Sequence, residues 1–383
     1  MPTFFSQKYR NLIVRTQQGK KFKFNEHFLY TNEEDAVLLR SNIIFGDCSY
    51  EEIISPGYKF KESEKRKILV QRMGGIGDVL FTTPVIKYLH DMGNIVDYYC
   101  NAYSVPVIEN NPYINKIWVN VDLVKHQQTP PGFGEIILDD VEDLYTKESK
   151  VPEKLTKEQY ASYDRVICYQ GAIEHNPEAE KEHAVDIMFK WAGIEPEGKE
   201  KKIQLFLTEQ EIEWGKKFIK RFKSMNGNKP VVGIAPNASA KIRSWEHYKK
   251  FIKQASKEFA YLYLHSEMGW TMRQTCAIVS QLSGIIAVDS GLLHVAGALD
   301  IPIIALFGAF NPDLRCRYYD NCSIVQGDNF CYNKHCYNHA DFCKTMNLSH
   351  KPTPCMNIDF KKINNTLRKA VQNVSANNNI KSK

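Results

Sequence analysis

The chain has 383 residues, enough for two domains of ordinary size and a smaller appendage. Its composition, 43% hydrophobic and 25% charged, is that of a soluble globular protein. The first ten residues, MPTFFSQKYR, do not combine a basic segment with an apolar core, so no signal peptide is evident and we expect a cytoplasmic protein. The net charge of +6 is modest and leaves phosphate, nucleic acid or an acidic membrane surface open as anionic partners.

The most apolar stretch, Ile285–Phe310, has the length of a membrane span but not its composition. Asp289, His294, Asp300 and Pro302 interrupt it, and no anchoring pattern flanks it. We interpret it as a buried strand, a helix and a second strand, and we expect no transmembrane segment.

Residues 1–66 are predicted to form a separate N-terminal appendage of small α+β type. Short alternating segments at Asn11–Thr16 and Lys21–Phe24 indicate strands, and Glu33–Arg40 indicates a helix.

From Lys67 onward, strands and helices alternate, which predicts a parallel sheet covered on both faces. In a first Rossmann-like domain, residues 67–205, we expect strands at Ile68–Gln71, Ile95–Cys100, Lys116–Asn120 and Arg165–Tyr169, with helices up to His90 and near Val105–Asn110. The polar stretch Lys125–Lys157 is interpreted as a surface insertion, with a mobile acceptor loop as the alternative.

A second Rossmann-like domain is expected at residues 206–383, ending in a helix. Its predicted strands are Val231–Ala235, Tyr261–His265, Gly284–Val288 and Pro302–Phe307, and Glu246–Phe259 forms an amphipathic helix between the first two.

A glycine loop follows the first strand of the first domain, at Gly74, Gly75 and Gly77. Its simplest interpretation is a tight strand-to-helix turn. The spacing is not G-x-G-x-x-G, and Asp97 is the clearest acid about 20 residues later, so a nicotinamide dehydrogenase is disfavoured.

Asp78 lies at the mouth of the helix after this loop, and Asp289 occupies a similar position after the strand Gly284–Val288. Ligands of open α/β sheets bind beyond the carboxyl ends of the strands, so two such units suggest two domains facing each other across a cleft. Asp78 is the candidate catalytic base, because a sugar hydroxyl needs a positioned proton acceptor. The alternative is that it only caps the helix.

Five separated segments, in the same order, resemble glycosyltransferase family 9, the bacterial heptosyltransferases that build the lipopolysaccharide core. The resemblance runs from Lys67 to Val374 and rests on RMGGIGDVLFTTP, NPYINKIW, YDRVIC, PNASAKIRSWEHY and VDSGLLHVAGALDIPIIALFGAFNP. It implies a GT-B architecture with the acceptor on the first domain and the donor nucleotide on the second. It also implies that transfer requires no metal cofactor and that Asp78 is the catalytic aspartate.

The resemblance further implies residues that bind the donor. Lys241 aligns with the family's phosphate-binding lysine, although the chain reads Lys-Ile-Arg-Ser where the family has Lys-x-Trp-Pro, so Arg243 could share the role. The helix after Asp289 offers free N–H groups to a phosphate. The complete set of candidate donor-binding residues is Asn237, Lys241, Arg243, Glu267, Asp289, Ser290, Gly291 and His294. For His294, a satisfied buried residue is the competing interpretation.

Six of the ten cysteines fall between Cys316 and Cys355. Four of them, Cys331, Cys336, Cys343 and Cys355, are candidate ligands of a structural zinc or iron ion, although their spacing is not that of common zinc folds. Free thiols are the alternative. The resemblance adds that some family members that glycosylate proteins bind iron in such a segment.

We therefore expect an inverting glycosyltransferase that uses a nucleotide diphosphate sugar, with ADP-heptose as the family's usual donor and a lipopolysaccharide-type glycan as acceptor. A protein acceptor stays open, and so does hydroxymethylated phage DNA, because KFKFNEHFLYTNEEDAVLLRSNIIFG resembles a short module of tailed-phage proteins. A non-catalytic nucleotide-sugar-binding scaffold is the alternative from another class, and a sugar-nucleotide epimerase would need other acids in the cleft. The sequence leaves the oligomeric state unknown.

Overall fold

The computed structural model describes residues 65–120, 153–327 and 336–381, with gaps at 157–158, 161, 171, 174–175, 256, 266–267, 337–341, 344 and 350. It also describes five N-terminal strands, β1 (Thr3–Phe5), β2 (Ile13–Arg15), β3 (Lys21–Lys23), β4 (Phe28–Tyr30) and β5 (Glu51–Ile53). The predicted helix Glu33–Arg40 and most of Lys125–Lys157 lie outside these residues.

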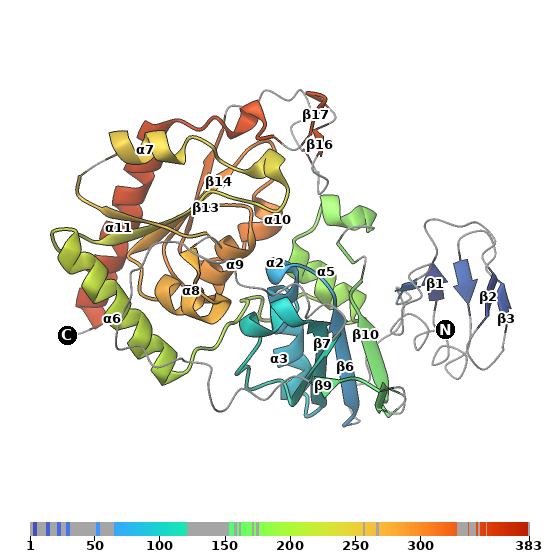
Figure 1. Cartoon of the computed structure of the whole chain (residues 1–383). Coiled ribbons are helices and arrows are strands. Elements are labelled where there is room, and N and C mark those ends of the chain that lie inside the picture. Colours follow the sequence, from blue (N-terminus) through green and yellow to red (C-terminus); the bar gives the residue numbers. More distant parts are fainter. Residues whose placement is uncertain are drawn as a thin grey trace.

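The first domain contains a five-stranded parallel sheet, which we call the first sheet (Figure 1). Its order is β10-β6-β7-β8-β9, and its strands are β6 (Lys67–Arg72), β7 (Ile95–Asn101), β8 (Lys116–Asn120), β9 (Glu153–Lys154) and β10 (Arg165–Cys168). Its helices are α2 (Ile76–Leu80), α3 (Thr83–Asp91), η1 (Ala102–Val107), η3 (Pro177–Glu180) and α5 (Ala184–Trp191). Strand β9 lies within the stretch predicted as an insertion and adds an edge strand to the sheet.

The second domain contains the second sheet, also parallel, with the order β12-β11-β13-β14-β15. These strands are β11 (Val231–Ala235), β12 (Ala260–Tyr263), β13 (Gly284–Val288), β14 (Ile303–Phe307) and β15 (Cys322–Gln326). The helices are α6 (Glu209–Met225), η4 (Lys241–Arg243), α7 (Tyr248–Gln254), α8 (Met272–Val279), α9 (Gly291–Ala298), α10 (Asp313–Cys316), η6 (Pro354–Met356) and α11 (Phe360–Lys381). A short hairpin, β16 (Phe342–Cys343) and β17 (Leu348–Ser349), precedes η6.

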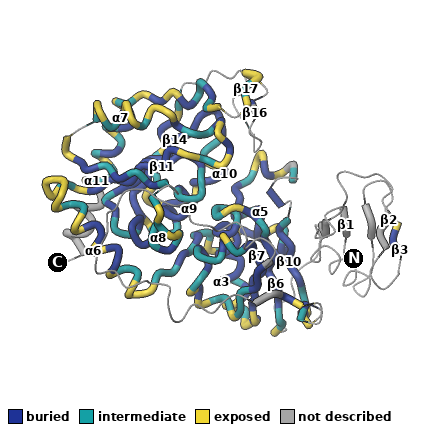
Figure 2. Tube along the Cα trace, in the orientation of Figure 1, coloured by how far each residue is buried: buried dark blue, intermediate teal, exposed yellow. Residues whose placement is uncertain are grey.

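Both faces of the second sheet are covered, as its uninterrupted apolar strands require. Along β13, Ile285 and Ala287 join the core beneath α6, α8 and α9, whereas Ile286 and Val288 join the core beneath α7 and α11 (Figures 1 and 2). The predicted architecture of two parallel-sheet α/β domains is therefore confirmed. Among the described residues, no helix combines the length and apolar character needed to cross a membrane.

Three predicted helices differ from the structure, each for a local reason. The helix expected to run to His90 is two helices, because Pro84 has no N–H to donate to the Leu80 carbonyl, and the Thr83 hydroxyl donates to it instead at 2.7 Å. Pro106 likewise limits the helix near Val105 to the 3-10 turn η1. The predicted helix Glu246–Phe259 extends only over Tyr248–Gln254, because Ala255 is extended.

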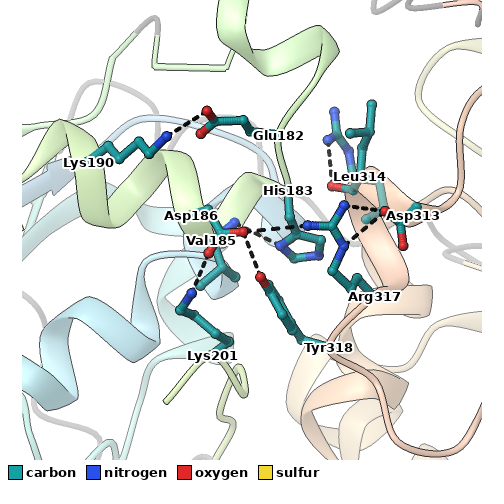
Figure 3. Close-up of polar contacts among 11 residues, drawn as sticks. Glu182, His183, Val185, Asp186, Lys190, Lys201, Asp313, Leu314, Arg317 and Tyr318 are labelled. Atoms are coloured by element: carbon teal, nitrogen blue, oxygen red, sulfur yellow. Dashed lines mark hydrogen bonds and ion pairs between the residues drawn. The ribbon is translucent and has the colours of Figure 1, made fainter. Parts of the chain in front are cut away.

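Two clusters of polar contacts join the domains. Arg273 of α8 is buried, pairs with Glu211 and donates to the Pro106 carbonyl of η1 at 2.9 Å. On the other side, α5 faces the residues after α10 (Figure 3). There Asp186 accepts hydrogen bonds from Lys201 at 2.5 Å and from Tyr318 at 2.6 Å, and the His183 ring packs edge-on against Tyr318. These contacts hold the carboxyl ends of the two sheets toward each other.

Candidate active site

The carboxyl ends of β6 and β13 meet where α2 packs against α9. A β-carbon added at Gly77 would lie 2.3 Å from the His294 ring, and one added at Gly291 would lie 3.1 Å from Ile76. The Phe81 and His294 rings are 4.6 Å apart between centroids. Gly77 and Gly291 therefore permit the close approach of two helices from different domains, which brings both candidate aspartates to one interface.

Asp78 forms an ion pair with an arginine at the end of its own sheet's first strand. Its Oδ1 lies 3.2 Å from Arg72 Nη2, and its Oδ2 accepts the Gly75 N–H at 2.9 Å. Arg72 also donates to the Tyr169 carbonyl at 2.8 Å. Arg72 is fully buried, whereas the side chain of Asp78 is 30% exposed. The structure thus shows the helix-capping contact and also leaves the carboxylate reachable from outside.

The electrostatic surroundings keep Asp78 ionised. Burial raises its pKa, but Arg72, the Gly75 N–H and Arg315 lower it, and the net pKa lies below the ordinary value for an aspartate. An ionised carboxylate is the form in which Asp78 can accept a proton.

Gly74 lies in the loop beside this pair. A β-carbon there would lie 2.7 Å from both Arg72 Nε and Asp78 Cβ, so a larger residue would displace the ion pair. Its carbonyl accepts a hydrogen bond from Tyr103 at 2.7 Å. The glycines of this loop therefore serve close packing around Asp78.

The second sheet also carries an arginine–aspartate ion pair at its carboxyl end, but here the aspartate is the more buried partner. Arg243 Nη1 lies 2.5 Å from Asp289 Oδ2, and here the carboxylate is 6% exposed and the guanidinium 20% exposed. Burial raises the pKa of Asp289, but Arg243, His294 and Arg315 outweigh it and hold that pKa well below its usual range. The more accessible partner on this side is the cation.

Ser290 and His294 lie on the helix that begins after Asp289. The Ser290 hydroxyl is buried, and it has no hydrogen-bond partner among the residues that the structure describes. His294 Nδ1 lies 2.7 Å from the Tyr319 hydroxyl, and its Nε2 lies 3.6 Å from Asp289 Oδ1. The histidine is thus engaged by the protein on both ring nitrogens, whereas the buried serine hydroxyl makes no hydrogen bond to the described residues.

The other candidate donor residues lie in the loops after β11 and β12. Lys241 is exposed at the start of η4, and it forms no ion pair within the described part of the chain. Asn237 donates from Nδ2 to the Tyr263 hydroxyl at 2.9 Å. Glu267 lies outside the described residues. Asp97 is buried and accepts from Tyr163 at 2.5 Å and from Asn115 at 2.8 Å, so it is occupied within the first domain.

Three of the four candidate metal ligands, Cys336, Cys343 and Cys355, line one small pocket together with Arg243. Thiol donors suit zinc and iron. Even so, the described residues contain no group of three histidine, cysteine or acidic side chains placed to hold a metal ion. Cys331 lies outside the described residues. Because no ligand cluster is assembled, no chemical step is assigned to a metal here.

Sequence reasoning missed Arg72 and Arg315. Arg72 is the only charged residue inside the apolar run that continues to the glycine loop, and that position was the available signal. Arg315 is buried, lies with its guanidinium carbon 5.0 Å from the Phe310 ring, and lowers the pKa of both Asp78 and Asp289. No local motif distinguished it.

The chain is similar in sequence to known glycosyltransferases. A model of glycosyltransferase family 9 (heptosyltransferase) matches residues 269–343. Lipopolysaccharide heptosyltransferase 2 of Salmonella typhimurium is 26% identical over 119 residues, 24% of this chain and 34% of that protein. The chain thus matches about a third of the length of this curated relative.

Two solved structures share the fold. The ADP-heptose lipopolysaccharide heptosyltransferase II of E. coli matches with a TM-score of 0.53 at 14% identity, covering 81% of this chain and 99% of that one. The iron-containing dodecameric glycosyltransferase TibC of enterotoxigenic E. coli matches with a TM-score of 0.51 at 12% identity, covering 97% of this chain and 92% of that one. TibC has also been solved in complex with ADP-D-β-D-heptose.

The two facing parallel-sheet domains therefore form the GT-B fold of these structures. Residues 269–343 thus match glycosyltransferase family 9, and the chain as a whole resembles the heptosyltransferases of that family in sequence and in fold.

Proposed function

We propose that the protein is an inverting glycosyltransferase that moves a heptose-like sugar from a nucleotide diphosphate to a hydroxyl group. This proposal rests on two ion pairs at one domain interface. The more exposed partner is an aspartate in one of them and an arginine in the other. The first sheet exposes a carboxylate backed by a buried arginine, and the second exposes an arginine backed by a buried carboxylate. A proton acceptor and an anion-binding cation are the two groups that such a transfer requires.

Asp78 is the proposed base. The acceptor hydroxyl loses its proton to the Asp78 carboxylate as its oxygen attacks the anomeric carbon of the donor, and the bond to the diphosphate breaks. Arg72 and the Gly75 N–H fix the orientation of the carboxylate. Because both contacts lower its pKa, Asp78 is a weak base that is nevertheless deprotonated throughout the neutral range.

The second sheet is proposed to hold the leaving diphosphate. Lys241 and Arg243 would supply positive charge, while the Ser290 hydroxyl and the free N–H groups that begin α9 would donate hydrogen bonds. Charge develops on the diphosphate as it departs, and preorganised donors stabilise that charge. Asp289 keeps Arg243 in place in this scheme, and His294 packs the two helices together.

ADP-heptose is the proposed donor and a lipopolysaccharide-type glycan the proposed acceptor. The names of the Salmonella relative and of the E. coli structure support both, and the complex of TibC supports the donor. A protein or DNA acceptor stays a prediction of lower rank, and residues 1–66 are the proposed place for recognising a macromolecule. The accessible carboxylate of Asp78 favours an enzyme over a non-catalytic binding scaffold.

A structural metal at the cysteines is proposed as an addition that takes no part in the transfer. Its support is the shared pocket of Cys336, Cys343 and Cys355, together with the iron in TibC. Thiolates there would bind the ion and stabilise the segment between β15 and α11.

The decisive experiment is the substitution Asp78→Asn. The amide can still accept the Gly75 N–H but cannot take a proton, so we expect turnover to fall by about 10²–10⁴-fold with little change in ADP affinity. Transfer from ADP-heptose and calorimetric ADP binding measure the two effects, and circular dichroism checks the fold.

Asp91→Asn is the matched control, because Asp91 ends α3 in the same domain and is 47% exposed. It should retain full turnover. Near-normal turnover of Asp78→Asn would remove Asp78 from the chemistry and leave it as a helix cap.

A further inference from the structure

Tyr319 follows α10 and packs its buried side chain against α9. A β-carbon added at Gly297 would lie 2.8 Å from the Tyr319 ring, so the glycine makes room for the ring. The Tyr319 hydroxyl lies 2.7 Å from His294 Nδ1. The packing of the ring thus places its hydroxyl on the imidazole of His294.

The His294 ring is enclosed from both domains. On the side of the first domain, a β-carbon added at Gly77 would lie 2.3 Å from the imidazole, and the Phe81 ring lies edge-on with its centroid 4.6 Å away. On the side of the second domain, the Tyr319 ring also lies edge-on, and His294 Nε2 lies 3.6 Å from Asp289 Oδ1. This packing gives each ring nitrogen one fixed partner.

The two partners select one tautomer of the neutral imidazole. Burial raises the pKa of Asp289, but its cationic and hydrogen-bonding neighbours outweigh this effect, so the carboxylate is ionised and attracts a proton on Nε2. Burial also raises the pKa of Tyr319 well above its ordinary value, so the hydroxyl keeps its proton and can donate to Nδ1. The hydroxyl is the stronger influence, because its contact is 2.7 Å and that of the carboxylate 3.6 Å. The single proton of the ring is therefore on Nε2 of His294.

This tautomer matters for Arg243, the cation proposed to bind the diphosphate. Asp289 Oδ2 lies 2.5 Å from Arg243 Nη1, and Asp289 Oδ1 faces His294 Nε2. The contact at Oδ1 is longer than a hydrogen bond, yet an N–H there attracts the carboxylate, whereas a nitrogen lone pair would repel it. The direction of the carboxylate, and with it that of the guanidinium, depends on which ring nitrogen carries the proton.

We propose that Tyr319 is a positioning residue for binding of the leaving diphosphate. Its hydroxyl keeps the His294 proton on Nε2, and that N–H attracts one oxygen of Asp289. The other oxygen then holds the Arg243 guanidinium in the orientation that binds the diphosphate. The inference rests on the proposed function, because it assigns the contacts behind a cation of the same site. In this role Tyr319 contacts no ligand and acts only through the residues between it and Arg243.

The first test determines the tautomer. The chain has 11 histidines, so the signal of His294 in protein with ¹⁵N-labelled imidazoles is assigned by its loss in His294→Gln. Two-bond ¹H–¹⁵N spectra distinguish a proton on Nε2 from one on Nδ1. We expect only the Nε2–H form in the unsubstituted protein. Tyr319→Phe loses the hydroxyl but keeps the ring against Gly297, and it should show a mixture of both tautomers.

The second test measures the affinity of the full chain for inorganic pyrophosphate by calorimetry. Tyr319→Phe should weaken binding by about 2- to 12-fold, which corresponds to the net free energy of one hydrogen bond. Arg243→Gln removes the positive charge but keeps an N–H for Asp289. In that background Tyr319→Phe should make no further difference, because effects of residues that act through one another do not add.

Tyr98→Phe is the matched control, because Tyr98 is a buried tyrosine of the first domain whose hydroxyl lies 3.0 Å from the Thr82 hydroxyl. It loses a comparable buried contact and should leave both the His294 tautomer and the pyrophosphate affinity unchanged.

An unmixed Nε2–H tautomer in Tyr319→Phe would overturn the positioning role while leaving the proposed function intact. Pyrophosphate affinity equal to that of the unsubstituted protein would do the same. An equal loss of affinity with Arg243 and with Gln at that position would also overturn the role, since Tyr319 would then act by another route. If the unsubstituted protein binds neither ADP nor pyrophosphate, the proposed function fails and the positioning role fails with it.

Discussion

The carboxyl ends of the two sheets carry the same pair of residue types in opposite arrangements. At the first sheet the arginine is fully buried and the aspartate is 30% exposed, whereas at the second the aspartate is 6% exposed and the arginine 20% exposed. Each buried partner is stabilised by its ion pair, and each accessible partner is oriented by it. Two related sheets thus present opposite charges to one interface.

The difference matters because the more exposed charge decides which ligand the carboxyl end of each sheet can bind. A buried arginine that also donates to the Tyr169 carbonyl cannot reach a ligand, but it holds Asp78 in its ionised form. The buried Asp289 fixes the orientation of the Arg243 guanidinium through their ion pair. Composition alone does not distinguish the two pairs, and only the packing around each one does.

The largest remaining effect is expected from removing positive charge at the second sheet. Lys241→Ala should weaken ADP binding by about 10- to 150-fold, the usual range for a hydrogen bond to a charged group, and it should slow transfer as well. Lys241 is exposed, so the fold should be unaffected. Calorimetric titration with ADP measures the affinity.

Lys250→Ala, at an exposed lysine of α7, is the control and should leave ADP affinity unchanged. If Lys241→Ala also binds ADP normally, the cationic role passes to Arg243. Arg243→Lys then becomes the informative variant, because it keeps a charge opposite the buried Asp289.

Much of this comparison could be predicted from the sequence. The strands β11 and β13 match their predicted ranges, because continuous runs of apolar and β-branched residues leave little choice of structure. Asp78 and Asp289 were found because each follows a strand and precedes a helix. The ion pairs were not predicted, because Arg72 and Asp78 are brought together by a turn, and Arg243 and Asp289 by the packing of separate loops.

The glycines likewise show that contacts made by packing cannot be predicted from a local sequence pattern. The sequence indicated Gly291 as a candidate donor-binding residue, and the structure adds that its missing β-carbon faces Ile76 of the other domain. That contact depends on how two domains dock, which no local pattern encodes. The stacking of the Tyr248 and Tyr263 rings was not predicted for a similar reason, since the two residues come from a helix and a strand.

The second prediction changes the charge behind Asp78. In the unsubstituted protein the acid limb of kcat/KM should lie below about pH 4, because Asp78 must be deprotonated to act and its pKa is lowered. Arg72→Gln removes the main lowering influence, and burial then raises the pKa. The acid limb should therefore move up by about 1–3 pH units, so activity is lost at a higher pH as the pH falls.

Arg72→Lys keeps a cation and serves as the comparison variant, with an acid limb close to that of the unsubstituted protein. The position of the limb reports the folded enzyme and does not depend on how much protein stays folded. An unmoved limb in Arg72→Gln would show that Asp78 does not titrate in the rate-limiting step. In that case the pair at the first sheet would be structural.

The smallest effect on the chemistry is expected from the cysteine segment, in which Cys336, Cys343 and Cys355 line a pocket with Arg243 of the second sheet's ion pair. Thr353 donates to the Ile242 carbonyl from its backbone N–H at 3.2 Å and from its hydroxyl at 3.0 Å, and thereby holds the middle residue of η4 in place.

If Cys336, Cys343 and Cys355 bind a structural metal, the purified protein should contain about one zinc or iron per chain. Chelation should lower the thermal midpoint and reduce ADP affinity by less than Lys241→Ala does, while the acid limb set by Asp78 stays in place. Cys343→Ser should lose the metal, whereas Cys322→Ser, outside the pocket, should keep it. Metal-free protein with an unchanged thermal midpoint would leave these cysteines as ordinary thiols, while Thr353 would still hold the loop that carries Arg243.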